Sequence, residues 1–197
     1  QRSRHTICSG FMLSPSPLIS IATNTATTIN AAASSALISL RIAPSVDNGL
    51  TGLIGAREII NRMQMTLRQM DALISTASGT AAFRIELILN GRLSAGTFQS
   101  AGGSSLAQLC LHAAGTVVTG GETIFSFFCQ NGVTQQDLSL VRDLGNSILG
   151  GGTSLTAPTG SADLYPDGPD IITIKATNVS ATNGTINARI SWTEAQA

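Results

Sequence analysis

Asn-Gly dipeptides punctuate this chain at four places: Asn48-Gly49, Asn90-Gly91, Asn131-Gly132 and Asn183-Gly184. Both residues tolerate the positive φ angles of a type I′ turn, so Asn-Gly between alternating apolar runs is the strongest short-range signal for a β-hairpin. Three of the four are flanked by such runs. The pattern predicts a mainly β chain with turns at Asn90, Gly91, Asn131, Gly132, Asn183 and Gly184.

The predicted fold is an antiparallel β-sandwich, with a jelly roll as one form of it, and one or two short helices. A length of 197 residues is enough for one domain with a substantial core. The run Ser14-Pro15-Ser16-Pro17 disfavours regular helix and favours extended backbone. We therefore expect residues 1–17 to form an extended arm or linker and residues 18–197 to form a single β-rich domain.

Individual segments differ in how clearly their residue pattern indicates a strand or a helix. Residues 83–89 alternate as a strand does and stop at the Asn90 turn. Residues 61–74 fit helical spacing slightly better, but we predict a strand because 83–89 needs a partner. Capping and spacing predict a helix over 104–115. A second short helix is expected from Thr134 or Asp137 to residue 144.

The most clearly patterned element is a hairpin near the C-terminus. Residues 170–177 and 185–192 alternate well and are joined through the Asn183-Gly184 turn. Ile186, Ile190 and Trp192 share one face of the second strand, and we expect that face to be core. A single Trp and a single Tyr are few aromatics for a sugar-binding face, which also favours a buried Trp192.

The composition is unusually poor in charge. Charged residues make up 11% of the chain, well below the roughly 25% of soluble domains, while apolar residues make up 43%. So weakly charged a surface associates when left bare. We therefore expect the chain to be covered by copies of itself. No basic stripe indicates nucleic acid, and no apolar run reaches the ~18 residues of a membrane helix.

Few residues offer chemistry. Asp163, Asp167 and Asp170 flank a turn-rich segment whose oxygens suit Ca²⁺, although turn formation and strand capping is the favoured interpretation. Cys110 and His112 lack the partners and spacing of a zinc site, and in a helix they do not share a face. A buried cysteine and a surface histidine are favoured there.

No catalytic constellation is recognisable. The chain has no Gly-x-Ser-x-Gly sequence and two histidines in all, one of them on the expected arm. We predict that the protein is not an enzyme and uses no cofactor.

From residue 55 to its end, the sequence resembles virion structural proteins of tailed phages, particularly those of cyanobacteria. The segments that carry this resemblance are GAREIINRM at 55–63, LILNG at 87–91, SLAQ at 105–108, TGGETIF at 119–125, LGNSILGG at 144–151, PDGPD at 166–170 and ARISW at 188–192.

The resemblance implies a structural building block of a virion, located in the tail, neck or baseplate in preference to the capsid. Its partners would be copies of itself and other virion proteins. In similar proteins this segment can close a longer chain. A receptor- or glycan-binding module, or a capsid decoration protein, is the alternative.

Overall fold

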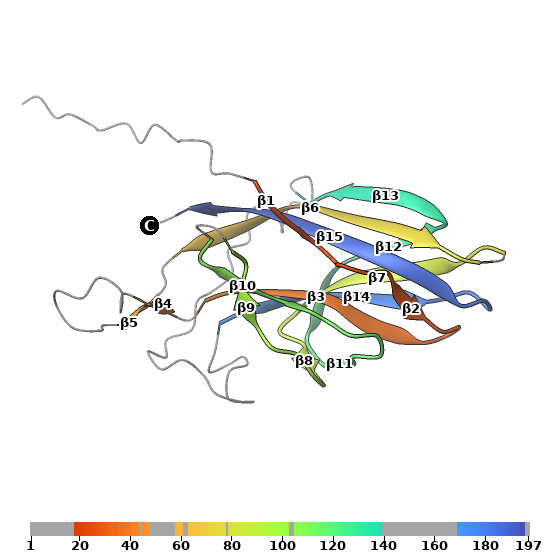
Figure 1. The fold of residues 1–197 in the computed structure, drawn as a ribbon, viewed down its shortest axis with the longest axis horizontal. Coiled ribbons are helices and arrows are strands. Elements are labelled where there is room, and N and C mark those ends of the chain that lie inside the picture. Colours follow the sequence, from red (N-terminus) through yellow and green to blue (C-terminus); the bar gives the residue numbers. More distant parts are fainter. Residues whose placement is uncertain are drawn as a thin grey trace, which may run out of the picture.

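Two antiparallel sheets face each other across one hydrophobic core (Figure 1). The computed structural model describes residues 18–43, 45–47, 58–60, 63–77, 79–102, 105–138 and 169–195. The expected arm at 1–17 and the Asn48-Gly49 dipeptide lie outside these residues.

The upper layer in Figure 1 is a five-stranded sheet, sheet A. Its order is β1 (Ile19–Ala22), β15 (Gly184–Ala195), β6 (Gln64–Ser75) and β13 (Gly132–Asp137), with β2 (Thr27–Ile29) also paired to β15.

The lower layer is a six-stranded sheet, sheet B. Its order is β12 (Glu122–Gln130), β7 (Ala82–Leu89), β14 (Ile171–Asn178), β3 (Ser34–Ile42), β10 (Ala107–Leu111) and β9 (Gln99–Ser100). The described residues also form two small ribbons, β8 (Arg92–Leu93) with β11 (Val118–Thr119) and β4 (Ser45–Asp47) with β5 (Glu58–Ile60).

The strand pairings are nested in the manner of one long hairpin rolled onto itself. From the outside inward, β2 pairs with β15, β3 with β14, β6 with β13 and β7 with β12, all antiparallel. Along the chain these strands alternate between sheets A and B, except at the innermost pair. This connectivity is that of a jelly roll. The predicted β-sandwich is therefore present in its jelly-roll form.

The core follows from period-two alternation. In β7, Phe83, Ile85 and Leu87 are buried and face sheet A, while the residues between them are only partly buried. Ile186, Ile190 and Trp192 are buried in the same core from β15, as expected for that face. Burying each such side chain contributes roughly 1.5–3 kcal/mol.

Helices are the main error in the predicted element list. The segment predicted as a helix over 104–115 contains β10, which pairs with five residues of β3. Thr134 lies within β13, so no helix begins there, whereas Asp137 is the last residue of β13 and residues 139–144 lie outside the described ranges. Pairing to a neighbouring strand outweighs a helical spacing that short segments satisfy easily. The strands predicted over 61–74 and 83–89 correspond to β6 and β7.

The predicted C-terminal hairpin is wrong in its pairing. Both strands exist, but β14 pairs with β3 and β7 in sheet B, whereas β15 pairs with β1, β2 and β6 in sheet A. Asn183-Gly184 therefore marks a crossing between sheets. The alternation of apolar residues reports which face is buried and carries no information about the neighbouring strand.

Asn90-Gly91 is not a hairpin turn either. It separates β7 from β8, and the opposite strand is broken at Gly120-Gly121 between β11 and β12. The two halves form one long hairpin with a kink in both strands. Asn90 has a φ of 56°, and a Cβ on Gly121 would lie 2.6 Å from the Gly91 nitrogen. The kink needs a positive φ and a close backbone approach, which these residues supply.

At Asn131-Gly132 the chain leaves β12 in sheet B and enters β13 in sheet A. Gly132 has a φ of 120°, which disfavours other residues. The side chain of Asn131 holds this corner, because its oxygen accepts from the Ala81 amide at 3.0 Å and its nitrogen donates to the Gly79 carbonyl at 3.2 Å. The dipeptides thus mark irregular backbone correctly, but the irregularities are kinks and crossings in place of two-residue turns.

Candidate interaction surfaces

The calcium candidate is not assembled among the described residues. Asp163 and Asp167 lie outside them, and one oxygen of Asp170 accepts from the Asn90 side-chain nitrogen at 2.8 Å. The Asn90 side-chain oxygen in turn accepts from the Ile171 amide at 2.9 Å. Asp170 thereby fixes the kink after β7. Within the described ranges, no group of three or more His, Cys, Asp or Glu side chains is placed to hold a metal ion.

Cys110 lies in β10 and His112 directly follows that strand, so the expected helix is absent here. His112 is buried, and the expected surface position is wrong. The Cys110 sulfur and the His112 Nδ1 are 3.6 Å apart. The Nε2 of His112 is 2.8 Å from the Ser39 hydroxyl, which is 2.8 Å from the Thr173 hydroxyl. Burial lowers the pKa of His112, which favours the neutral imidazole.

This polar chain lies beneath the loop that carries Gly96. A Cβ built on Gly96 would lie 2.8 Å from the Cys110 sulfur and 2.9 Å from the His112 Cε1. The loop backbone at Gly96 therefore packs directly against these two side chains. Ser39 is fully buried, so its hydroxyl beside His112 is not exposed to solvent. Burial also raises the pKa of the Cys110 thiol, which disfavours a reactive thiolate. The cluster attaches the loop to sheet B.

Trp192 takes part in a second polar network, which is partly buried. Its indole N–H donates to Glu194 Oε1 at 2.7 Å. The same carboxylate accepts from the Ser105 hydroxyl at 2.5 Å and from the Leu106 amide at 3.0 Å. Trp192 is 0% exposed and is therefore not available to stack on a ligand. The sequence shows Glu194 two residues after Trp192, but nothing in the pattern assigns it this role.

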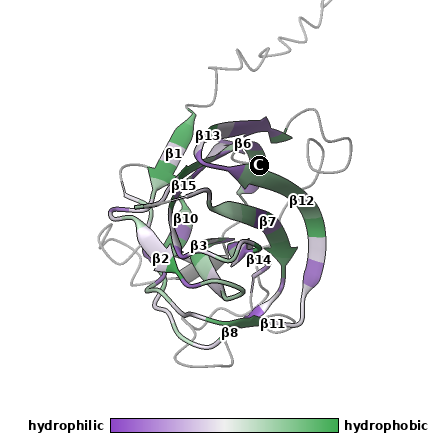
Figure 2. Cartoon of the chain, turned by 90° about the vertical axis from the view of Figure 1, so that its right-hand side faces the viewer, coloured by the Kyte–Doolittle hydropathy of each residue, from purple (hydrophilic) through white to green (hydrophobic). Residues whose placement is uncertain are grey.

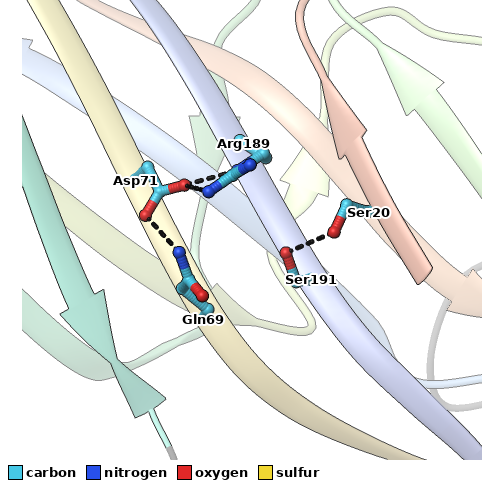
Figure 3. Close-up of polar contacts among 5 residues, drawn as sticks. All are labelled: Ser20, Gln69, Asp71, Arg189 and Ser191. Carbon is cyan, nitrogen blue, oxygen red and sulfur yellow. Dashed lines mark hydrogen bonds and ion pairs between the residues drawn. The ribbon is translucent and has the colours of Figure 1, made fainter. Parts of the chain in front are cut away.

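The outer face of sheet A is polar and nearly free of net charge. Figure 3 shows Asp71 of β6 paired with Arg189 of β15 and accepting from Gln69 at 2.8 Å. Beside them, the hydroxyls of Ser20 and Ser191 are 2.7 Å apart. These contacts pair the polar groups of the face with one another, within β6 and between neighbouring strands.

One apolar pair interrupts that face at its edge. Val133 of β13 lies directly opposite Leu73 of β6 in the strand register. Val133 is 75% exposed and Leu73 is 45% exposed. Opposite side chains on antiparallel strands are about 5 Å apart at their Cβ atoms, so the two form one contiguous patch.

The edge of sheet B carries the most exposed aromatic side chain in the described part of the chain. Phe128 of β12 is 70% exposed and lies opposite Arg84 of β7 on the outer face. Phe125 and Phe127 point to the other side and are half-buried against the core. Figure 2 shows β12 at the rim of the sandwich with a hydrophobic stretch along it. The consecutive aromatics at 127 and 128 were the available sequence signal for this exposure.

The open edges of the two sheets differ in length. On one side of the sandwich, β1, β2 and β9 are 4, 3 and 2 residues long. On the other side, β12 has 9 residues and β13 has 6. Short edge strands protect a sheet against unwanted pairing, whereas long ones invite it. The side formed by β12 and β13 is therefore the better candidate for contact with another chain.

Comparison with models of protein families finds no match, and comparison with curated proteins finds no significant match. No helix formed by the described residues is long and apolar enough to span a membrane.

Proposed function

We propose that this protein is a structural building block of a tailed-phage virion and acts by symmetric self-assembly. The observation that carries the proposal is the long open side of the sandwich, where β12 and β13 end both sheets and expose Phe128 and Val133. Buried apolar surface drives association, and closed symmetry limits its extent. Low charge, at 11% of the residues, supports the same conclusion.

The jelly roll supports a virion role by analogy, because this architecture recurs in viral capsid proteins as well as in lectins and cupins. The sequence resemblance supports a tailed phage, with the tail, neck or baseplate preferred to the capsid. Other virion proteins are the further partners in this proposal. Its mechanism is assembly and includes no catalytic step, cofactor, nucleic-acid contact or membrane contact.

A receptor- or glycan-binding module is the competing proposal, and the burial of Trp192 counts against it. Sugar-binding sites stack aromatic rings on their ligands, and this ring lies in the core with its N–H bonded to Glu194. A capsid decoration protein is a further alternative. It would occupy the outer surface of the head and not the tail, neck or baseplate.

The test has two parts. Sedimentation of the purified protein at 10 to 200 µM, on the order of the Kd of transient contacts, should give a defined oligomer. A monomer throughout would contradict self-assembly. Antibody labelling of intact phage particles should then place the protein on the tail, neck or baseplate. Labelling over the whole head would favour the decoration alternative, and absence from washed particles would contradict a virion role.

A further inference from the structure

Among the described residues, few of the features that usually protect a sheet edge lie on β12. Within the described ranges, β12 pairs with β7 on one side and with no strand on the other. Residues 123–130 contain no charged residue and no proline, the two residue types that commonly guard sheet edges. A bulge between Thr123 and Phe125 is a protective feature, but it lies near the start of the strand.

The second half of β12 is regular and suited to pairing. From Phe125 to Gln130 each residue lies opposite a consecutive residue of β7, without a further shift in register. In this half, Phe128 projects from the outer face with 70% of its surface exposed. An exposed aromatic on an open edge combines unpaired hydrogen-bonding groups with unburied apolar area.

We propose that β12 pairs antiparallel with β12 of a second copy of this chain, around a two-fold axis that passes beside Phe128. The inference rests on the proposed function and names the surface that would serve it. Antiparallel pairing about a two-fold axis is self-complementary, because residue i of one copy meets residue j of the other and the reverse. The two sheets B would become one continuous sheet.

In this register, side chains of similar character from the two copies lie opposite each other. The Phe128 rings of the two copies meet at the axis on the outer face, where cross-strand aromatic pairs are favourable. Ser126 lies opposite Gln130 of the second copy, and Phe127 lies opposite Cys129 of the second copy on the core side. No charge is buried between the two strands.

The nearest charged groups tolerate the contact. Arg84 of β7, opposite Phe128, is ion-paired with Glu86, which also pairs with Lys175 of β14. Across the axis, the two copies of Arg84 would be three strand spacings apart, or about 14 Å at ~4.8 Å per spacing. That exceeds the Debye length of about 8 Å at physiological salt, so their repulsion is largely screened.

A charge placed at the axis tests the proposal. Phe128→Lys adds two like charges at the contact and should shift the dimer to monomer in sedimentation, with at least a tenfold weaker Kd. Because Phe128 is exposed, the variant should retain the thermal transition of the wild type. Leu18→Lys is the matched control, since Leu18 is also largely exposed but precedes β1, at the opposite edge of sheet A. It should leave this dimer intact.

A paired-cysteine variant tests the register. Within one chain, residues 126 and 130 are about 13 Å apart along the strand, too far for a disulfide. In the proposed dimer, position 126 of one copy lies about 5 Å from position 130 of the other, within disulfide range. The double variant Ser126→Cys with Gln130→Cys should therefore form covalent dimers under mild oxidation, whereas Ser126→Cys alone should not.

The native cysteines of the described region compete poorly in this experiment. Burial raises the pKa of Cys129 to about 11 and also raises that of Cys110, so both thiols react slowly. Wild-type protein under the same oxidant provides the background. Cross-linking by Ser126→Cys alone would overturn the axis at Phe128.

The outcomes separate the two proposals. If the wild type assembles but Phe128→Lys assembles equally well, edge pairing is overturned and self-assembly stands. A wild type that stays monomeric overturns both.

Discussion

Trp192 and Glu194, two residues apart on β15, form a hydrogen bond of 2.7 Å from the indole N–H to the carboxylate. The bond occurs where a bulge between Ser191 and Trp192 shifts the register against β6. Beyond the bulge, Glu194 reaches the segment that leads into β10 in the other sheet. One pair of side chains therefore joins the two sheets at this end of the sandwich.

Replacing Trp192 with Ala should destabilise the protein by about 3–5 kcal/mol, because it empties a fully buried aromatic site. Chemical denaturation with circular dichroism measures the loss. Trp192→Phe keeps most of the apolar volume and should cost clearly less. In the wild type, Trp192 emission should be blue-shifted and poorly quenched by acrylamide. A red-shifted, readily quenched emission would contradict the buried position.

Glu194→Gln should destabilise by about 1–3 kcal/mol, because an amide nitrogen then faces one of the donors that the carboxylate accepted from. Glu122 provides the matched control, as it is an exposed glutamate on β12. Glu122→Gln should change the free energy of unfolding by less than about 0.5 kcal/mol. Equal effects of the two substitutions would show that the Glu194 network contributes little.

The sequence predicts burial better than it predicts partners. Alternation in β7 and β15 identifies the core faces, including Ile186, Ile190 and Trp192, because the period of side-chain direction is local. Pairing is not local: β14 and β15 are adjacent in the chain and lie in different sheets. The five-residue connection between β14 and β15 is long enough for a crossing between sheets and for a hairpin, so its sequence is compatible with both.

The exposed surface at Phe128 is harder to predict from the sequence than the strand pairing. Exposure of Phe128 follows from the position of β12 at a sheet edge, and strand order is decided by long-range pairing. Cys110 and His112 show the same limit. Their contact depends on the extended conformation of β10, whereas a helix would place the two side chains on different faces.

Asn90 offers a test of why asparagine occupies the kink. Asn90→Ala should cost about 2–5 kcal/mol, of which about 1–2 reflects the positive φ of 56°, which alanine adopts less readily than asparagine. The rest reflects two lost side-chain hydrogen bonds, to Asp170 and to the Ile171 amide, at about 0.5–1.5 kcal/mol each. Asn90→Gly relieves the backbone term and should cost about 1–2 kcal/mol less than Asn90→Ala. Equal costs would contradict the role of the positive φ.

The buried His112 should make stability depend on pH. Burial lowers its folded-state pKa below the ordinary 6.5, with desolvation as the main cause and a hydrogen bond to the Ala95 backbone opposing it. The unfolded chain therefore takes up this proton at a higher pH than the folded chain. The stabilising contribution is complete above pH 6.5 and is lost as the pH falls below it.

The limiting slope of that loss is about 1.4 kcal/mol per pH unit. Unfolding measured at intervals between pH 7.5 and 5.5, a range of about one unit on either side of the ordinary histidine pKa, should show the decline. His112→Gln keeps a polar side chain near Ser39 and removes the titration, so its stability should be flatter over this range. Because carboxylates titrate mainly below about pH 5, they contribute little to the difference between the two proteins. Identical pH profiles for wild type and His112→Gln would show that His112 is not held neutral by the fold.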